Sequence, residues 1–373
     1  MVILHVLAPG AVGGLERVVR SLAEGHRALG HRVCVAVIHE LGQVDHPFVS
    51  ALSESGIEVM PIRVAPRAYL TERAMIAALC GTLRPDVFHV HGYRPAIVDA
   101  GVARHLRIPT VTTVHGFTGG GWKNRLYESL QRRAFRQFDA VVAVSRPLAE
   151  ALMRDRALRG RVHEIRNAWD DAVAFLDHSA ACRELRVPDD GFRLGWVGRV
   201  THEKGPDVML QALALLGDTA VQLSMLGDGR ERDRLQRRGE ALGVGTRVTW
   251  HGTVAEAASL FRAFDVFVLS SRTEGTPMAL FEAMAAGVPV VATAVGGVPE
   301  VVSPAEAILV PPDDPASLAG AVRETLRDPA AARDRARAAR RRLEREFAVQ
   351  PWLERYETLY RAIRRRGAAL VGR

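Results

Sequence analysis

The stretch that decides the fold is Ser270-Ser271-Arg272-Thr273-Glu274-Gly275-Thr276-Pro277-Met278-Ala279-Leu280-Phe281-Glu282-Ala283-Met284-Ala285-Ala286-Gly287-Val288-Pro289. The apolar runs on either side of it, 266–269 and 290–292, are typical of buried strands. Between them the sequence predicts a helix with Thr276 as its N-cap and Pro277 at its first position. Gly287 fits the left-handed residue that ends a helix. The stretch therefore predicts a strand–helix–strand unit.

Two carboxylates accompany this helix: Glu274 lies in the loop before it and Glu282 lies within it, seven residues further on. A helix N-terminus offers free N–H groups and the positive end of a dipole, which attract anions. A carboxylate instead accepts hydrogen bonds from hydroxyl groups, such as the diol of a sugar. The combination indicates a ligand with both phosphate and sugar groups. The alternative is that Glu274 is an ordinary loop carboxylate and Glu282 a solvated helix residue.

The segment resembles the E-x7-E signature of retaining glycosyltransferases of family 4 (group 1). The resemblance implies the GT-B fold, an α/β architecture with two Rossmann-like parallel-sheet domains facing a central cleft. It also implies that Glu274 contacts the transferred sugar and Glu282 the nucleotide ribose. Further substrate contacts would come from Gly275, Thr276, Pro277, Met278 and Ala279. Because Thr276-Pro277 stands where many relatives have Phe-Gly, the sugar cannot be inferred from them.

Length and composition fit a two-domain enzyme. A chain of 373 residues can bury two cores, and 48% hydrophobic with 25% charged residues is ordinary for a globular protein. The net charge of +8 suits an anionic partner such as a nucleotide sugar, an anionic lipid surface or a nucleic acid. Three scattered cysteines without C-x-x-C spacing indicate a reducing compartment. No run reaches transmembrane length, so we expect a cytoplasmic protein, with peripheral contact at the inner membrane face left open.

The first half begins with a strand at 2–8, a glycine-rich loop, a helix and a second strand at 31–38. The loop and helix N-terminus of such a βαβ unit suit a phosphate, although Gly13 and Gly14 could equally form a simple tight turn. The resemblance places Gly13 and Gly14 against the donor diphosphate.

Three more residues follow strands in the first half. His91 and His115 stand at the ends of strands at 86–92 and 109–116, where parallel sheets bind their ligands, although a lone histidine there can also be structural. The resemblance places the imidazole of His115 near the donor sugar. Asn167 ends a strand at 162–166. The family pattern has Pro-Asn-Gly here, and this chain has Ala168 in place of the glycine.

A basic helix is predicted after the loop 117–121, opening at Trp122 and carrying Arg132, Arg133 and Arg136. A basic amphipathic helix can contact a membrane or lipid phosphate, and a solvated arginine-rich face is the alternative. The resemblance assigns acceptor binding to this part of the chain.

The second half repeats the pattern, with a strand at 192–197, a loop from Gly198 to Gly205 and a helix from residue 207. Arginine offers a planar fork and lysine a point charge, and both bind phosphate oxygens. The spacing lets Arg199 and Lys204 reach one diphosphate, and an ordinary charged surface is the alternative. The resemblance matches these two residues and Gly198 to the family's phosphate site, and places the turn containing Val254 against the base.

We therefore expect an N-terminal, acceptor-side domain at 1–168, a linker at 169–190, a nucleotide-sugar domain at 191–347 and a C-terminal helix at 348–373 that crosses back to the first domain. Residues 319–347 are expected to be helical. In the final helix Trp352, Tyr356, Leu359, Tyr360 and Ile363 form one apolar stripe.

The expected activity is transfer of a sugar from a UDP- or GDP-sugar to a hydroxyl of a glycan, lipid-linked or small-molecule acceptor, in bacterial polysaccharide, glycolipid or glycoconjugate synthesis. The sequence has no D-x-D motif for a metal, so Arg199, Lys204 and helix amides would stabilise the leaving diphosphate. No metal or other cofactor is expected. The catalytic group is predicted to be His115, Arg199, Lys204 and Glu274.

Other functions remain open at this point. A sugar-nucleotide epimerase shares the same architecture. A phosphorylase-like enzyme needs a pyridoxal lysine, and Lys123 and Lys204 are the only lysines. A basic nucleic-acid binder is a more distant alternative, but the arginines are not interleaved with aromatic residues as in a base-stacking platform, so no nucleic-acid partner is expected.

Overall fold

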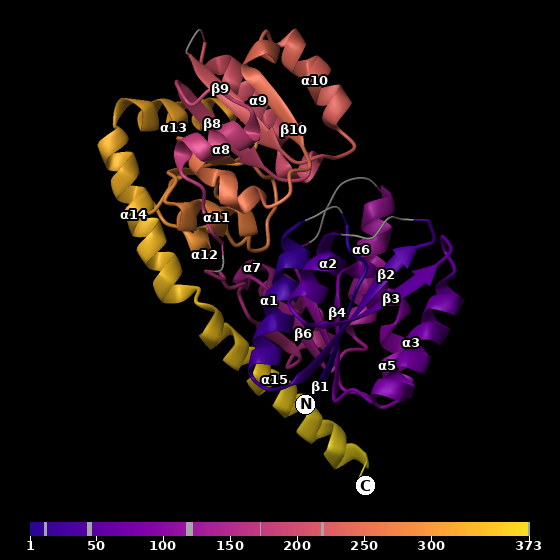
Figure 1. Cartoon of the computed structure of the whole chain (residues 1–373). Coiled ribbons are helices and arrows are strands. Elements are labelled where there is room, and N and C mark those ends of the chain that lie inside the picture. The colour runs from indigo at the N-terminus through magenta and orange to yellow at the C-terminus, as the bar shows by residue number, and fades with distance from the viewer. Residues whose placement is uncertain (11–12, 43–46, 117–121, 172, 218–219, 372–373) are drawn as a thin grey trace. The chain divides into compact units, whose positions relative to one another are not determined.

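The computed structural model describes residues 1–10, 13–42, 47–116, 122–171, 173–217 and 220–371, without the side chains of 122–127 and 367–371 (Figure 1). Backbone contacts divide the chain into two compact units. Unit 1 comprises Met1–Ala168 and Val349–Arg373, and unit 2 comprises Trp169–Ala348. The predicted loop 117–121 lies outside the described residues, as do the side chains at the start of the basic helix.

Seven parallel strands form the sheet of unit 1, in the order β3-β2-β1-β4-β5-β6-β7. They are β1 (Val2–Leu7), β2 (Arg32–Glu40), β3 (Glu58–Val64), β4 (Val87–His91), β5 (Thr110–Val114), β6 (Ala140–Ala143) and β7 (Val162–Glu164). Strands β4, β5 and β6 are buried along their whole length, as expected for short apolar runs covered on both faces. Because the strands are parallel, their carboxyl ends lie along one edge of the sheet.

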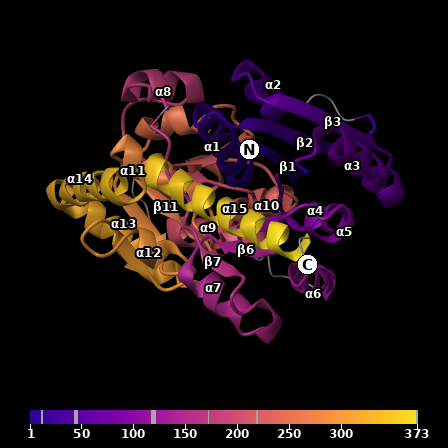
Figure 2. The ribbon, with the colours of Figure 1, turned by 90° about the horizontal axis from the view of Figure 1, so that it is seen from below.

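The helices of unit 1 connect and cover these strands. They are α1 (Gly14–Ala28), α2 (Pro47–Glu54), α3 (Tyr69–Leu83), α4 (Tyr93–Val98), α5 (Ala100–His105), α6 (Trp122–Phe135), α7 (Arg146–Met153), the short η1 (Arg156–Leu158) and α15 (Val349–Val371). Helix α15, yellow in Figure 2, packs against α1 and buries its predicted apolar stripe. The two helices approach closely at Gly25, where a Cβ would lie 2.4 Å from a methyl group of Leu353.

Unit 2 has a parallel sheet of six strands in the order β10-β9-β8-β11-β12-β13. They are β8 (Phe192–Val197), β9 (Val221–Leu226), β10 (Val248–Gly252), β11 (Val266–Leu269), β12 (Val290–Thr293) and β13 (Ile308–Val310). The helices are α8 (His178–Leu185), α9 (Pro206–Leu215), α10 (Arg232–Ala241), α11 (Met278–Ala286), α12 (Val298–Val301), α13 (Pro315–Arg327) and α14 (Pro329–Glu346), with short turns η2 (His202–Lys204), η3 (Gly245–Arg247) and η4 (Ala257–Ala263).

Two helix boundaries differ from the predictions. Helix α11 begins at Met278, because the ψ of 118° at Pro277 is extended and makes that residue, not Thr276, the N-cap. The expected helix at 319–347 is two helices, because proline cannot donate a backbone hydrogen bond and disfavours helix at the residue before it. Asp328 accordingly leaves the helical conformation before Pro329 and caps α14 with its side chain.

The range 169–190, where a linker is expected, carries structure of its own. Helix α8 lies within it and is capped by Asp177, whose carboxylate accepts a hydrogen bond from the Ala180 N–H at 2.8 Å. Helix α8 packs against η4, and the whole range clusters with unit 2.

Candidate active site

The loop after β8 passes close to the end of β11 in unit 2. Gly205 ends the turn η2 with a φ of +62°, and a Cβ there would lie 1.9 Å from the carbonyl oxygen of Ser270. Only glycine fits this approach without displacing the backbone. The hydroxyl of Ser270 donates to the Gly205 carbonyl at 2.8 Å and contacts the indole nitrogen of Trp196 at 3.1 Å. These contacts fix the backbone on which Lys204 is carried.

The loop after β11 is held in the same way from its other side. A Cβ at Gly296 would lie 1.8 Å from the carbonyl oxygen of Glu274, and the Gly297 N–H donates to the Gly275 carbonyl at 3.0 Å. The loop after β12 therefore supports the backbone that carries Glu274 immediately before helix α11.

Lys204 and Glu274 form a two-pronged ion pair between these loops. The Lys204 ammonium lies 2.7 and 2.8 Å from the two carboxylate oxygens of Glu274, and the Ser271 hydroxyl donates to the same carboxylate at 2.6 Å. The Glu274 side chain is 5% exposed and that of Lys204 is 23% exposed. A buried carboxylate needs such partners, because removal from water otherwise disfavours its charge. The structure thus brings together two of the four predicted catalytic residues.

Arg199 contacts neither Glu274 nor Lys204 in the described interactions. Its guanidinium is 52% exposed and lies 3.4 Å from Glu203 in an i,i+4 pair. Gly198, next to it, donates its N–H to the Leu226 carbonyl and leaves room for the Lys204 side chain, whose Cδ would lie 3.9 Å from an added Cβ. The predicted sharing of one phosphate group by Arg199 and Lys204 stays a prediction.

The other predicted residues of unit 2 gather at the same sheet edge or on α11. Gly275, Thr276, Pro277 and Met278 are buried, and Ala279 is half-buried in the first turn of α11. Glu282 is half-buried in its second turn. Val254 is half-buried in the loop after β10. Helix α11 thus begins at the loop that carries Glu274, where its free N–H groups can receive an anionic ligand group.

In unit 1, His115 follows β5 directly. Its Nε2 is buried and has no hydrogen-bond partner among the described residues, and burial lowers its pKa to about 4. Gly13 is the extended N-cap of α1 and Gly14 is exposed at its first position, beyond the carboxyl end of β1. Asn167 is buried beyond β7.

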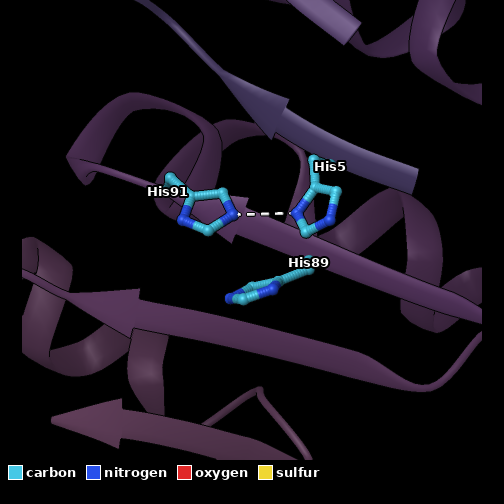
Figure 3. A group of neighbouring side chains, drawn as sticks. All are labelled: His5, His89 and His91. Atoms are coloured by element: carbon cyan, nitrogen blue, oxygen red, sulfur yellow. Dashed lines mark hydrogen bonds between the residues drawn. The ribbon is translucent and has the colours of Figure 1, made fainter. Parts of the chain in front are cut away.

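A layer of buried histidines lies next to His115, on strands β1 and β4 and helix α1. Strand pairing places His5 of β1 opposite His89 of β4, and His91 follows two residues later on the same face (Figure 3). Nδ1 of His5 lies 3.0 Å from Nε2 of His91, and the ring of His91 lies 6.0 Å from that of His115. Burial, together with the neighbouring histidines, lowers the pKa of His89 and His91 well below the usual value. His26 of α1 is also buried, and its ring stacks against that of His5 with 6.3 Å between the ring centroids. We call His5, His26, His89 and His91 the histidine layer.

Three members of the histidine layer are the described residues that could hold a metal ion, since one nitrogen from each of His5, His89 and His91 lies within 4.8 Å of the others. Hydrogen bonds already use both nitrogens of His89 and one nitrogen each of His5 and His91, whereas Nε2 of His5 and Nδ1 of His91 have no hydrogen-bond partner among the described residues. Nδ1 of His89 lies 2.7 Å from the Tyr360 hydroxyl and its Nε2 lies 2.8 Å from the Thr113 hydroxyl, while His5 and His91 pair with each other. We therefore interpret His5, His89 and His91 as uncharged imidazoles, with His5 hydrogen-bonded to His91, and His89 to Thr113 and to Tyr360 of helix α15.

Sequence reasoning singled out His91 but missed His5 and His89. The signal was present in the alternation His89-Val90-His91, because residues two apart on a strand share a face. The partner strand could not be known without the sheet order.

Among the described residues, no helix combines the length and the apolar character that crossing a membrane requires.

Comparisons with known proteins identify the family. Residues 12–173 match the family model described as Glycosyltransferase Family 4, and residues 180–342 match Glycosyl transferases group 1. Glycogen synthase of Mycobacterium tuberculosis is 30% identical over 396 residues, which cover 96% of this chain and 93% of that protein. The 2-deoxystreptamine N-acetyl-D-glucosaminyltransferase of Streptomyces fradiae is 32% identical over 314 residues, covering 77% and 72%.

Solved structures show the same fold. Anabaena HepE in complex with UDP-glucose matches with a TM-score of 0.84 at 24% identity, covering 96% of this chain and 99% of that one. Sucrose-phosphate synthase of Thermosynechococcus elongatus matches with a TM-score of 0.81 at 23% identity, covering 97% and 98%. The prediction of two parallel-sheet domains of the GT-B type is confirmed. The chain belongs to glycosyltransferase family 4, within the glycosyl transferases of group 1.

Proposed function

We propose that this glycosyltransferase moves a sugar from a nucleotide-diphosphate donor, a UDP- or GDP-sugar, to an acceptor hydroxyl, with retention of the anomeric configuration and without a metal ion. The acceptor would be a glycan, a lipid-linked sugar or a small molecule of bacterial polysaccharide, glycolipid or glycoconjugate synthesis. The observation that carries the proposal is the Lys204–Glu274 pair, which joins a phosphate-binding cation to a sugar-binding carboxylate beside the N-terminus of α11.

Different residues of unit 2 stabilise the leaving diphosphate and bind the nucleotide ribose. When the bond between the anomeric carbon and the diphosphate oxygen breaks, its electron pair stays on the phosphate. Lys204, Arg199 and the free N–H groups of α11 stabilise that charge, and each such donor contributes roughly 3 kcal/mol to the transition state. Glu282 on α11 accepts hydrogen bonds from the ribose hydroxyls.

Glu274 holds hydroxyl groups of the donor sugar and does not attack the anomeric carbon. Its carboxylate is already engaged by Lys204 and Ser271, which lowers its nucleophilicity and orients its oxygens. The acceptor hydroxyl then attacks from the face that the diphosphate leaves, and its proton passes to the departing phosphate oxygen. This same-face route accounts for retention without a covalent sugar–enzyme bond.

Unit 1 would bind the acceptor, and three of its residues would also contact the donor. His115 would offer a neutral imidazole to a sugar hydroxyl, since burial lowers its pKa to about 4 and keeps it uncharged at neutral pH. Gly13 and Gly14 would offer backbone N–H groups at the start of α1 to the diphosphate.

The test is thermal stabilisation of the purified protein by UDP-, GDP- and ADP-sugars, each with and without EDTA. UDP-glucose comes first, because HepE was solved with it. A donor at about 100 times its dissociation constant adds about 2.7 kcal/mol to the free energy of unfolding. A selective shift that survives EDTA supports the donor class and the metal-free site. A shift that needs a divalent ion contradicts metal independence, and no shift with any donor contradicts the proposed function.

A further inference from the structure

We infer that Arg272 is a positioning residue that sets the distance between Lys204 and Glu274 by tying three loops of unit 2 together. The inference rests on the proposed function and deepens it, because it identifies which residue holds Lys204 and Glu274 at a fixed position relative to each other.

Arg272 makes hydrogen bonds to three separate segments. Its guanidinium donates to both carboxylate oxygens of Asp207, each at 2.8 Å, and to the His202 carbonyl at 2.7 Å. Its Nε donates to Asp313, in the loop after β13, at 2.6 Å. Its backbone N–H donates to the Glu203 carbonyl at 2.8 Å. We call Arg272, Asp207 and Asp313 the Arg272 bracket.

In the sequence, two of the residues that the Arg272 bracket joins lie close to Lys204 and Glu274. Glu203, which accepts from the backbone of Arg272, immediately precedes Lys204, and Glu274 follows Arg272 by two residues. A shift of the loop after β8 against the loop after β11 therefore changes the Lys204–Glu274 distance unless Arg272 resists it. A planar fork that binds a carboxylate through two parallel bonds fixes both distance and orientation, which a single lysine contact does not.

The charges of the bracket are stable at neutral pH. Burial alone would raise the pKa of Asp207, but the hydrogen bonds and the charge of Arg272 bring it below its ordinary value. The hydrogen bonds to Asp207 have the largest effect on the pKa of Arg272 and raise it, burial lowers it, and the charge of Asp207 together with the hydrogen bond and charge of Asp313 carries it above its ordinary value. The side chains of Arg272 and Asp207 are each 17% exposed, so water competes only weakly for the bonds between them, whereas Asp313 is 60% exposed and its bond to Arg272 is the weaker part of the bracket.

The hydrogen bonds of Arg272 occupy four of the five N–H groups of its guanidinium. Its Nε and both terminal nitrogens already donate to protein oxygens. Arg272 thus acts through Lys204 and Glu274 and not by touching the donor. This separates it from Arg199, whose guanidinium is more than half exposed.

The first test reads the Lys204–Glu274 pair directly and needs no substrate. Lys204 is one of two lysines, so its acylation by an amine-specific reagent can be followed by mass spectrometry with Lys123 as the internal reference. Arg272→Gln should raise the relative labelling rate of Lys204 about tenfold, the factor that corresponds to losing one hydrogen bond to a charged group. Asp207→Asn is the milder second variant and should raise it in the same direction.

Arg247→Gln is the matched control. Arg247 is also half-buried and donates to the carbonyls of Val221, Gly217 and Leu213, at the amino end of β9 and away from the carboxyl ends of the strands. Its loss should lower the melting temperature and leave the labelling of Lys204 unchanged. If Arg272→Gln and Asp207→Asn behave like Arg247→Gln, Arg272 is merely structural and the inference is overturned.

The second test measures release of UDP from UDP-glucose. A displacement of about 1 Å between reacting groups costs about 100-fold in rate, so Arg272→Gln should lower kcat by that factor with a much smaller change in KM. Arg247→Gln should keep the wild-type rate in its folded fraction. The two proposals fail separately: a wild-type protein that binds no nucleotide sugar contradicts the proposed function, whereas unchanged labelling of Lys204 contradicts the role of Arg272.

Discussion

The Lys204 ammonium donates hydrogen bonds to both carboxylate oxygens of Glu274, although 69 residues lie between them in the chain. The contact joins the loops that follow β8 and β11, which are neighbouring strands of one parallel sheet. The ligand-free site therefore pairs its cation with its anion. A donor that brings a negative diphosphate and neutral sugar hydroxyls can satisfy Lys204 and Glu274 separately.

Glu274→Gln should separate binding from turnover. The neutral amide no longer neutralises Lys204, so its ammonium is freer to bind a phosphate, and the dissociation constant for UDP should stay equal or fall. Turnover of the donor should drop about 100-fold, because the carboxylate that we propose orients the sugar is lost. Calorimetry with UDP and a UDP-release assay measure the two effects. Glu324→Gln, at an exposed site on α13, is the control, and near-normal turnover of Glu274→Gln would refute its role.

Lys204→Gln should destabilise the protein more than Glu274→Gln does. It leaves a carboxylate of 5% exposure with only the Ser271 hydroxyl as a described partner, and breaking a buried pair from one side costs roughly 3 kcal/mol. The double variant Lys204→Gln/Glu274→Gln removes both charges and should recover most of that stability while remaining inactive. Urea unfolding of the four proteins measures the coupling. Additive losses would show that the two side chains are not coupled.

Gly205→Ala and Gly217→Ala should differ although both glycines flank α9 with similar backbone. Their φ values are +62° and +68°, so a side chain strains both, by about 1 kcal/mol. A Cβ at Gly205 would also lie 1.9 Å from the Ser270 carbonyl, whereas one at Gly217 meets nothing within 4 Å. Gly205→Ala should therefore lower the free energy of unfolding more than Gly217→Ala does and weaken UDP binding, as melting and calorimetry would show. Equal effects would mean that the close approach is unimportant.

The sequence predicted the elements that positioned Lys204 and Glu274, because glycine and proline punctuate loops that follow apolar strands. Gly287 ends α11 with a φ of +73°, as its place after the apolar stripe indicated. The N-cap prediction at Thr276 was wrong by one residue, since nothing local distinguishes an extended Pro277 from a helical one.

The Arg272 bracket could not be predicted in the same way. Asp207 and Asp313 lie 65 and 41 residues from Arg272, and each is an ordinary acidic residue near a helix start in sequence. Only the order β8-β11-β12-β13 brings their loops to one edge. The histidine layer was hidden for the same reason, because pairing of β1 with β4 sets His5 beside His89.

Acid should destabilise unit 1 through the histidine layer. Burial lowers the pKa of His5 and His26 to about 3, while an unfolded histidine has a pKa of about 6.5. Below about pH 6.5 the histidines of the unfolded chain are protonated, whereas the buried histidines of the native state stay neutral. The free energy of unfolding therefore falls as the pH drops, by about 1.4 kcal/mol per pH unit for each such histidine. Asp99 acts in the opposite direction, because burial raises its pKa to about 8 and the native state holds its proton.

The difference between wild type and His26→Gln measures how much one buried histidine contributes to the pH dependence of stability. Removing one titrating imidazole should reduce the loss of stability between about pH 7 and pH 5.5, measured by hydrogen exchange of the β4 amides. His105→Gln, at an exposed position on α5, should leave the slope unchanged. A wild-type slope in the His26→Gln protein would contradict the assignment.

Tyr360→Phe should loosen helix α15 more than Tyr356→Phe does. The Tyr360 hydroxyl lies 2.7 Å from Nδ1 of His89, and its loss leaves a fully buried ring nitrogen without that partner, which costs about 1–3 kcal/mol. The Tyr356 hydroxyl lies 3.2 Å from the Thr113 hydroxyl, which keeps its contact with Nε2 of His89. Hydrogen exchange along α15 should therefore rise more in Tyr360→Phe. Because His89 shares its strand and face with His91, the same variant should speed exchange at the end of β4, whereas a change confined to α15 would show that the helix is not coupled to the histidine layer.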